Sequence, residues 1–274
     1  MRYLRFATII ILVVSVLFSL WANNRYYSNL NTDLPVLSNS LETLEISVKD
    51  PPEAVLAGLQ AQDATDGDLT DQIMVASVSH FLETGTVNMK YVVFDSHNNS
   101  ATLTRKVHYT DYTAPQFSLE KAPVYMVGRS FDLLDYIRVE DCIDGDISDN
   151  VRVISNMVNN FAAGNYPVVL EVSNAYGDTA QVTVWVRFLN KESSAVVELK
   201  KHIVYVQQGD SFQPKKLLKG VTDLNGTALD KSDVQIQGSV NMDKPGCYQL
   251  IYSYDVGKLT AEAPLTVVVT ERQD

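Results

Sequence analysis

Cysteine is scarce in this chain, and its scarcity excludes a scaffold held by disulfide bridges. Only Cys142 and Cys247 occur among 274 residues, too few for the framework that stabilises small secreted domains. We expect two separate, half-buried thiols rather than a bridge between them. Hydrophobic residues make up 46% of the chain, an ordinary share for folded domains, so long disordered segments are not expected.

Signatures of catalytic sites are missing as well. The four histidines, His80, His97, His108 and His202, do not stand at metal-ligand spacing from a cysteine or from one another. The G-x-S-x-G motif of serine hydrolases does not occur. A hydrolase that uses two carboxylates stays open because acidic residues abound, but it is the least favoured alternative. We therefore expect a protein without enzymatic activity.

Basic residues are outnumbered by acidic ones. The chain has 22 Lys and Arg against 33 Asp and Glu, and its formal net charge is −11. A negatively charged surface repels nucleic acid and anionic lipid, so neither is expected as a partner. The same surface favours solubility and leaves cation binding open.

Long hydrophobic runs are limited to one, Phe6–Ala22. As a helix it would be about 26 Å long, enough for the core of a bilayer. Because Trp21 and Arg25 stand at its end, we expect an uncleaved signal anchor that contacts the membrane through residues 6–22. Arg2 and Arg5 would hold the N-terminus in the cytoplasm, giving a single-pass protein of the cell membrane with extracytoplasmic domains. The alternative is a cleaved signal peptide and a secreted protein.

An acidic segment occurs twice in the chain. Ala61–Val75 reads AQDATDGDLTDQIMV, and Val139–Val153 reads VEDCIDGDISDNVRV. The aspartates return at one constant offset, so that Asp63, Asp66, Asp68 and Asp71 become Asp141, Asp144, Asp146 and Asp149. A period of about 80 residues that keeps turn residues and apolar positions indicates a repeated domain.

Two interpretations of these aspartates compete. Their carboxylates are the hard oxygen ligands that calcium prefers, so all eight are candidate calcium ligands. Their spacing is not that of an EF-hand loop. The structural interpretation is favoured: Asp-Gly-Asp forms a turn in which Gly67 takes a positive φ, and Asp68 or Thr70 caps a short helical turn. No cofactor other than calcium is expected.

Strand and turn signals recur in three repeats. Apolar residues alternate with a period of two in Tyr166–Val172 and Val182–Phe188, which indicates strands rather than helices. His97-Asn98-Asn99 predicts a hairpin turn, because asparagine tolerates a positive φ. Six or seven short strands per repeat favour an antiparallel β-sandwich, and the short links between repeats predict a semi-rigid rod. We expect this division: anchor helix 1–25, polar stalk 26–40, and repeats 41–111, 112–190 and 194–271.

The motif D-x-x-D-G-D-(L/I)-(T/S), followed by G-x-Y-x-V and a closing V-x-V-x-V strand, resembles bacterial immunoglobulin-like domains. The similar type occurs in pesticidal crystal proteins and is related to hyalin repeats. The resemblance covers most of residues 41–270. It implies an all-β fold of three tandem Ig-like antiparallel β-sandwich domains, here after one N-terminal transmembrane helix. It also implies extracytoplasmic placement and adhesive, spacer or ligand-presenting roles, and it implies no catalytic residues.

These observations predict a non-enzymatic, membrane-tethered cell-surface protein. Its Ig-like repeats would act as an adhesive or spacer, or present a binding site to a surface protein or a glycan. The alternative is a cell-wall or glycan binding or sensing module with its binding face on the third repeat. Tyr248, Tyr252 and Tyr254 share one side of a strand there, where a place in the core is favoured over an exposed aromatic face.

Overall fold

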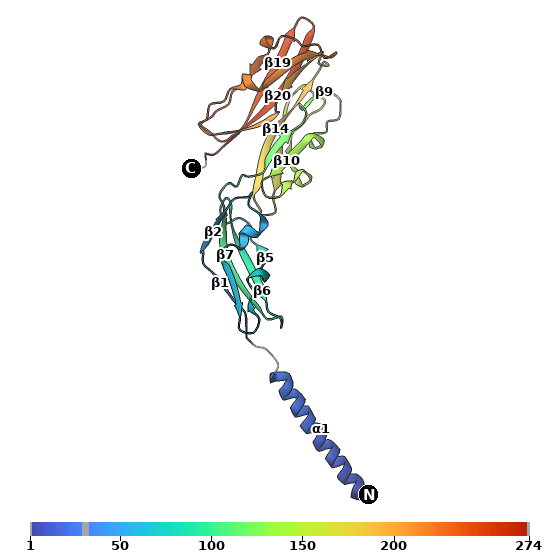
Figure 1. The fold of residues 1–274 in the computed structure, drawn as a ribbon. Coiled ribbons are helices and arrows are strands. Elements are labelled where there is room, and N and C mark those ends of the chain that lie inside the picture. The colour runs from blue at the N-terminus through green and yellow to red at the C-terminus, as the bar shows by residue number, and fades with distance from the viewer. Residues whose placement is uncertain (1, 29–32, 273–274) are drawn as a thin grey trace. The chain divides into compact units, whose positions relative to one another are not determined.

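The computed structural model describes residues 2–28 and 33–272, and the side chains of the first helix from Ile11 to Arg25 (Figure 1). The chain divides into two compact units. The first holds residues 1–82 and 86–109, and the second holds residues 83–85 and 110–274. Each unit is described by itself below.

Helix α1 (Arg2–Ser28) contains the expected anchor. The hydrocarbon core of a bilayer is roughly 30 Å thick. In the part of the chain that the structure describes, no helix has the length and apolarity needed to cross a membrane. The prediction of a single-pass anchor, with its membrane contact and cell-membrane location, is therefore wrong.

The first unit contains two β-sheets and two 3-10 turns. The smaller sheet has the order β1-β3-β4 and the larger has the order β2-β7-β6-β5. The strands are β1 (Val36–Asn39), β2 (Thr43–Ile46), β3 (Leu59–Asp63), β4 (Gly67–Asp68), β5 (Met74–Val78), β6 (Thr86–Phe94) and β7 (Ser100–Tyr109), and the turns are η1 (Pro52–Leu56) and η2 (Thr70–Gln72). Strand β1 lies within residues 26–40, which were expected to be a stalk. Its backbone pairs with β3 from Val36 to Asn39, so this part of the segment belongs to the first sandwich.

The second unit begins with the second repeat, which again has two sheets. Their orders are β11-β10-β8 and β12-β13-β14-β9. The strands are β8 (Gln116–Leu119), β9 (Val124–Met126), β10 (Ile137–Asp141), β11 (Gly145–Asp146), β12 (Arg152–Asn156), β13 (Gly164–Ser173) and β14 (Thr179–Leu189), with turns η3 (Leu134–Tyr136) and η4 (Ser148–Asn150). The sheet positions match those of the first unit strand for strand.

The third repeat completes the second unit. Its smaller sheet pairs β15 with β17, and its larger sheet has the order β16-β20-β19-β18. The strands are β15 (Ala195–Leu199), β16 (Ile203–Gln207), β17 (Leu218–Asp223), β18 (Gln235–Gln237), β19 (Gly246–Val256) and β20 (Leu259–Thr270), with turns η5 (Pro214–Leu217) and η6 (Lys231–Asp233). The expectation of an all-β protein with sandwich-like sheets is confirmed.

Each larger sheet differs from the prediction at one edge, where two strands run parallel. The parallel pairs are β2 with β7, β9 with β14 and β16 with β20. In every repeat the chain passes from the smaller sheet to the edge of the larger one, so a short strand joins the last strand in the same direction. The sandwiches are therefore mixed and not purely antiparallel.

The alternation read from the sequence agrees with burial. In β14, Val182, Val184, Val186 and Phe188 are buried, while the residues between them are half-buried. The core of the second repeat joins these side chains to Phe117 and Val139 of the opposite sheet. Asn98 has a φ of 64°, as the predicted hairpin between β6 and β7 requires.

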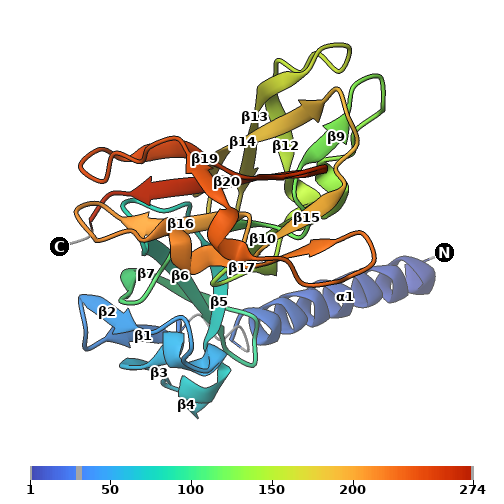
Figure 2. The same cartoon turned by 90° about the horizontal axis from the view of Figure 1, so that it is seen from above.

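The second and third repeats pack side by side, with β14 next to β20 (Figures 1 and 2). Ile203 and Val268 of the third repeat belong to the buried cluster of the second. The guanidinium of Arg187 donates to both carboxylate oxygens of Glu262, at 2.6 and 3.2 Å. These contacts make one compact unit of two repeats that had been expected to follow one another along a rod.

Candidate functional site

The first acidic loop connects β3 to η2, and its carboxylates hold its own backbone. Asp63 is buried, and its Oδ1 accepts hydrogen bonds from the N–H groups of Thr65 and Asp66 at 2.8 and 2.9 Å. Gly67 has a φ of 78°, as predicted for the turn. These bonds satisfy backbone donors that a tight turn would otherwise leave unpaired.

The second half of the loop is held by a pair of side chains. Asp68 accepts a hydrogen bond from the N–H of Thr70 at 2.9 Å, and the hydroxyl of Thr70 accepts one from the N–H of Ala61 at 3.1 Å. Hydrogen bonds from the side chain and the backbone of Thr70 hold the pKa of Asp68 below its ordinary value. Asp68 therefore caps the short turn, in agreement with the structural interpretation.

The second acidic loop repeats this arrangement. Asp141 Oδ1 accepts from the N–H groups of Ile143 and Asp144, both at 2.9 Å. Hydrogen bonds from the side chain and the backbone of Ser148 lower the pKa of Asp146. The same turn is thus made twice from the same residue types.

The second aspartate of each loop reaches across to a neighbouring hairpin. Asp66 accepts from the N–H and the hydroxyl of Ser96, at 2.8 and 2.9 Å, in the turn between β6 and β7. Asp144 accepts from the N–H of Ala175 at 2.6 Å, in the turn between β13 and β14. Each acidic loop is therefore hydrogen-bonded to the turn of the long hairpin in its own repeat.

The predicted ligands do not converge on one centre within either loop. Asp71 and Asp149 are exposed on the 3-10 turns, while the other carboxylates point to different backbone groups. Among the described residues, one group of at least three metal-binding side chains places its ligand atoms within 4.8 Å of one another: Asp66, Asp95 and His97. Only Asp66 of this group was predicted.

Asp95 and His97 could not be found from the acidic motif, because they lie on the turn between β6 and β7. Asp95 is 6% exposed, and its carboxylate accepts from the N–H groups of His97 and Asn99 at 2.8 and 2.7 Å. Burial acts to raise the pKa of Asp95, but hydrogen bonds from Asn99 and His97 and the nearby His97 ring outweigh it and hold the pKa below its ordinary value. A carboxylate at this position is therefore ionised at neutral pH.

The third repeat keeps only the turn. Asp223 accepts from the N–H groups of Asn225 and Thr227, at 2.9 and 2.8 Å, and these bonds, that from Thr227 foremost, lower its pKa. Neither Asn225 nor Thr227 brings a second carboxylate. The loss of the acidic signature in this repeat leaves its fold intact.

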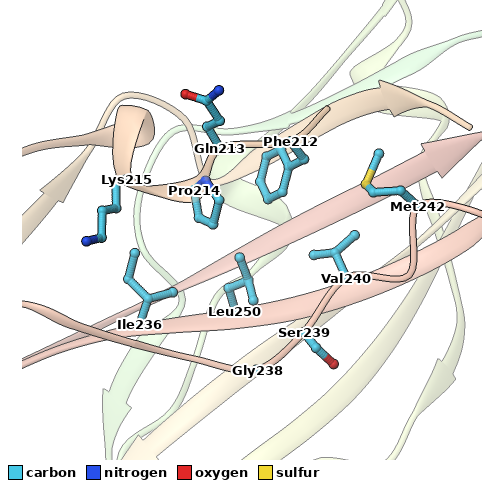
Figure 3. Close-up of a pocket in the computed structure, with 10 residues that line it drawn as sticks. All are labelled: Phe212, Gln213, Pro214, Lys215, Ile236, Gly238, Ser239, Val240, Met242 and Leu250. Atoms are coloured by element: carbon cyan, nitrogen blue, oxygen red, sulfur yellow. The ribbon is translucent and has the colours of Figure 1, made fainter. Parts of the chain in front are cut away.

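An apolar pocket with a volume of about 580 Å³ opens on the third repeat (Figure 3). On one side it is lined by Phe212 and by Pro214 at the start of η5, and on the other by the segment after β18, with Leu250 of β19 at its floor. The other lining residues are Gln213, Lys215, Ile236, Gly238, Ser239, Val240 and Met242. Gly238 has a φ of 104°, and a Cβ there would collide with the backbone oxygen of Gln249. The shape of the pocket therefore requires glycine at this position.

The tyrosines considered as an aromatic face are mostly core residues. Tyr252 is fully buried, and its hydroxyl donates to the carbonyl of Pro214 at 2.8 Å. Tyr254 is buried too, and Tyr248 is half-buried with its hydroxyl bonded to Lys244. The prediction that these tyrosines belong to the core, and not to an exposed aromatic face, is confirmed for Tyr252 and Tyr254.

Comparison with known proteins identifies the repeat type. Residues 197–269, which span β15 to β20, match the family described as bacterial Ig-like domain (group 3). The pesticidal crystal protein Cry22Aa of Bacillus thuringiensis is 29% identical over 203 residues, which make up 71% of this chain and 27% of that protein. The resemblance to bacterial Ig-like domain repeats is confirmed. The chain spans about a quarter of the length of this relative.

Similar solved structures are more distant. A ZmpB structure from Clostridium perfringens, with CBM51-2 in complex with GlcNAc and with INT domains, has a TM-score of 0.23 at 16% identity and covers 54% of this chain and 26% of its own. Drosophila N-cadherin EC1–3 has a TM-score of 0.30 at 10% identity and covers 85% of this chain and 98% of its own. Scores this low carry no argument about function.

Proposed function

We propose that this chain is a non-enzymatic recognition protein whose Ig-like repeats carry and present a binding site. The pocket of the third repeat is the binding site, and the other repeats serve as adhesive or spacer modules. The observation that carries this proposal is the composition of the pocket: six of its lining side chains are apolar. They are Phe212, Pro214, Ile236, Val240, Met242 and Leu250.

The charge around the pocket indicates the class of partner. Lys215 lines its edge and Lys216 follows it in η5; both side chains are exposed in a protein of net charge −11. Apolar contact supplies most of the affinity in such a pocket, while charged groups at the edge select and orient the ligand. The partner is therefore a protein segment that carries a large apolar side chain next to acidic residues.

The arrangement of the acidic loops supports a role without catalysis. A catalytic carboxylate needs an open approach to a substrate and a second group placed to act with it. Asp63, Asp68, Asp141 and Asp146 instead accept hydrogen bonds from backbone N–H groups of their own turns. Their chemistry is used to hold the fold.

The test is NMR titration of the isotope-labelled full chain with two short peptides that share one leucine and phenylalanine core, one flanked by glutamates and one by lysines. We expect shifts of Ile236, Val240 and Met242 resonances with the acidic peptide, weakened at high salt. Val240→Glu should abolish the shifts. Val196→Glu is the matched control, because Val196 is 44% exposed on β15 and does not line the pocket.

Three results would overturn the proposal. Shifts that fall outside the pocket would place binding elsewhere on the chain. An equal response to the basic peptide would contradict the partner chemistry. Shifts produced by N-acetylglucosamine oligomers and not by either peptide would make the chain a glycan-binding module.

A further inference from the structure

One oxygen in the first repeat is buried without a hydrogen-bond partner. Asp63 is 7% exposed, and its Oδ1 is used by the turn, but its Oδ2 has no partner. A buried acceptor without a donor is costly, and the cost is greater for a charged group. The equivalent oxygen of the second repeat, Asp141 Oδ2, accepts from the Asn174 amide at 3.1 Å.

The missing donor follows from one difference between the repeats. Asn174 and Asp95 occupy the same place in the turn between the two long strands of their repeats, β13 and β14 in one and β6 and β7 in the other. Asn174 Oδ1 accepts from the N–H groups of Tyr176 and Asp178, at 3.1 and 2.9 Å, as Asp95 Oδ1 does from His97 and Asn99. The other branch of the side chain is an NH₂ donor in Asn174 and a carboxylate oxygen in Asp95. Where the second repeat has an amide aimed at a buried carboxylate, the first has a second carboxylate.

The surroundings of Asp95 add further ligands. Its ligand atom lies within 4.8 Å of those of Asp66 and His97. The amide of Asn99 donates to Asp95 Oδ2 at 2.7 Å, and it also reaches the carbonyl of Asp33 at 3.4 Å. In the second repeat, the hydroxyl of Tyr112 donates to Asp178 at 2.6 Å and accepts from Asn174. The second repeat thus supplies its acids with hydrogen-bond donors of its own.

We propose that the first repeat binds one divalent cation between the carboxylates of Asp63 and Asp95, with Asp66 and His97 at the edge of the site, and that the second repeat binds none. A carboxylate-rich site of this kind suits calcium, which takes oxygen ligands in flexible geometry. The cation takes the place of the hydrogen-bond donor that the amide of Asn174 supplies in the second repeat. This proposal is independent of the pocket on the third repeat.

The test is isothermal titration calorimetry of the full chain with calcium chloride after treatment with a chelator, with magnesium and zinc as parallel probes. We expect one calcium per chain and a rise in the melting temperature of the first unit at millimolar calcium. Asp95→Asn copies the second repeat. It should raise the melting temperature measured without calcium and lower the calcium affinity at least tenfold. Asp149→Asn, an exposed acid on η4, is the matched control and should change neither.

The reverse substitution tests the same proposal in the second repeat. Asn174→Asp places two carboxylates in the second repeat and should raise the stoichiometry from one calcium to two. Two calcium ions on the unmodified chain would instead support both acidic loops as sites and overturn the proposal. So would the absence of any calcium response in a chain that Asp95→Asn stabilises. Binding of zinc alone would overturn the choice of a calcium-like ion.

Discussion

Asn174→Asp is also the sharpest test of the buried polar network in the absence of any cation. Asn174 is 6% exposed, and its amide donates to Asp141 Oδ2 at 3.1 Å and to the hydroxyl of Tyr112 at 2.9 Å. An ionised aspartate at this position donates nothing. The substitution keeps the shape of the side chain and its Oδ1 acceptor, so only the donor and the charge change.

The expected loss of stability follows from two effects. A hydrogen bond to a charged group is worth about 1.5–3 kcal/mol, and two unit charges 4 Å apart repel by about 4 kcal/mol at an effective dielectric constant of 20. This loss of stability has an upper limit, because the new carboxyl can take up a proton instead. Holding a carboxyl of pKa 3.9 neutral at pH 7 costs about 4 kcal/mol, at 1.36 kcal/mol per pH unit. We expect Asn174→Asp to lower the free energy of unfolding by about 3–4 kcal/mol at pH 7.

The pH dependence has a definite sign. The new carboxyl has a raised pKa in the folded variant, so the folded state binds more protons than the unfolded state between that pKa and about 4. Stability lost at pH 7 should therefore return as the pH falls, by roughly 1.4 kcal/mol per unit relative to the unsubstituted chain. A protonated carboxyl can also donate to Asp141 again.

The assay is urea unfolding without calcium at pH 7 and pH 5, followed by the fluorescence of Trp185 in β14 with Trp21 replaced by phenylalanine. Asn150→Asp is the matched control, because Asn150 is exposed and its substitution should stay within about 0.5 kcal/mol. Equal stability of Asn174→Asp and Asn150→Asp at pH 7 would refute the reasoning. So would a loss in Asn174→Asp that is the same at both pH values.

Three further predictions concern the second unit. Burial lowers the pKa of His202, so the unfolded state binds its proton first and the unit should lose stability as the pH falls below about 6.5; His202→Leu should flatten that slope in the Trp185 assay. Arg187→Ala and Glu262→Ala should show a coupling energy of about 1–2 kcal/mol in a double-mutant cycle, more than an exposed ion pair gives; a coupling near zero would contradict this. Gly145 has a φ of 72° and open space around its Cα, so Gly145→Ala should cost about 1–2 kcal/mol in unfolding experiments and Gly145→Asn less.

The parts of the fold that were predictable are those in which a residue's neighbours lie close in the sequence. Val182, Val184 and Val186 alternate in one strand and are buried as expected. Gly67 and Asn98 adopt positive φ because the turns in which they lie need it. Short-range geometry of this kind is contained in spacing alone.

The candidate cation site could not be read in this way, because its members come from different turns. Asp66 and Asp95 meet only after β6 has folded back beside the acidic loop. Arg105 breaks the apolar alternation of β7, yet it is 3% exposed and donates to the carbonyls of Val55 and Ala57, both at 2.6 Å. A buried arginine of this kind is set by carbonyls some fifty positions away, which no local period reveals.

The side-by-side packing of the second and third repeats did leave a trace in the sequence. A strand of a sandwich that faces solvent on one side shows alternating burial, whereas one covered on both faces shows a continuous apolar run. Residues 263–269 of β20 are all buried, including Val268 on the face turned away from the core of its own repeat. The run PLTVVV before Thr270 therefore indicates a strand covered on both sides.

The repeats differ at the two proposed sites. In the second repeat, Phe131 packs against the rings of Tyr125 and Phe188, each with a centroid distance of 5.9 Å. Pairing with the glycine that opens the neighbouring long strand puts Val269 of the third repeat where Phe188 stands in the second. In the third repeat, Phe212 lines the pocket. One exchange of an amide for a carboxylate leaves the first repeat with a buried oxygen that has no donor, while the sandwich that carries it stays the same.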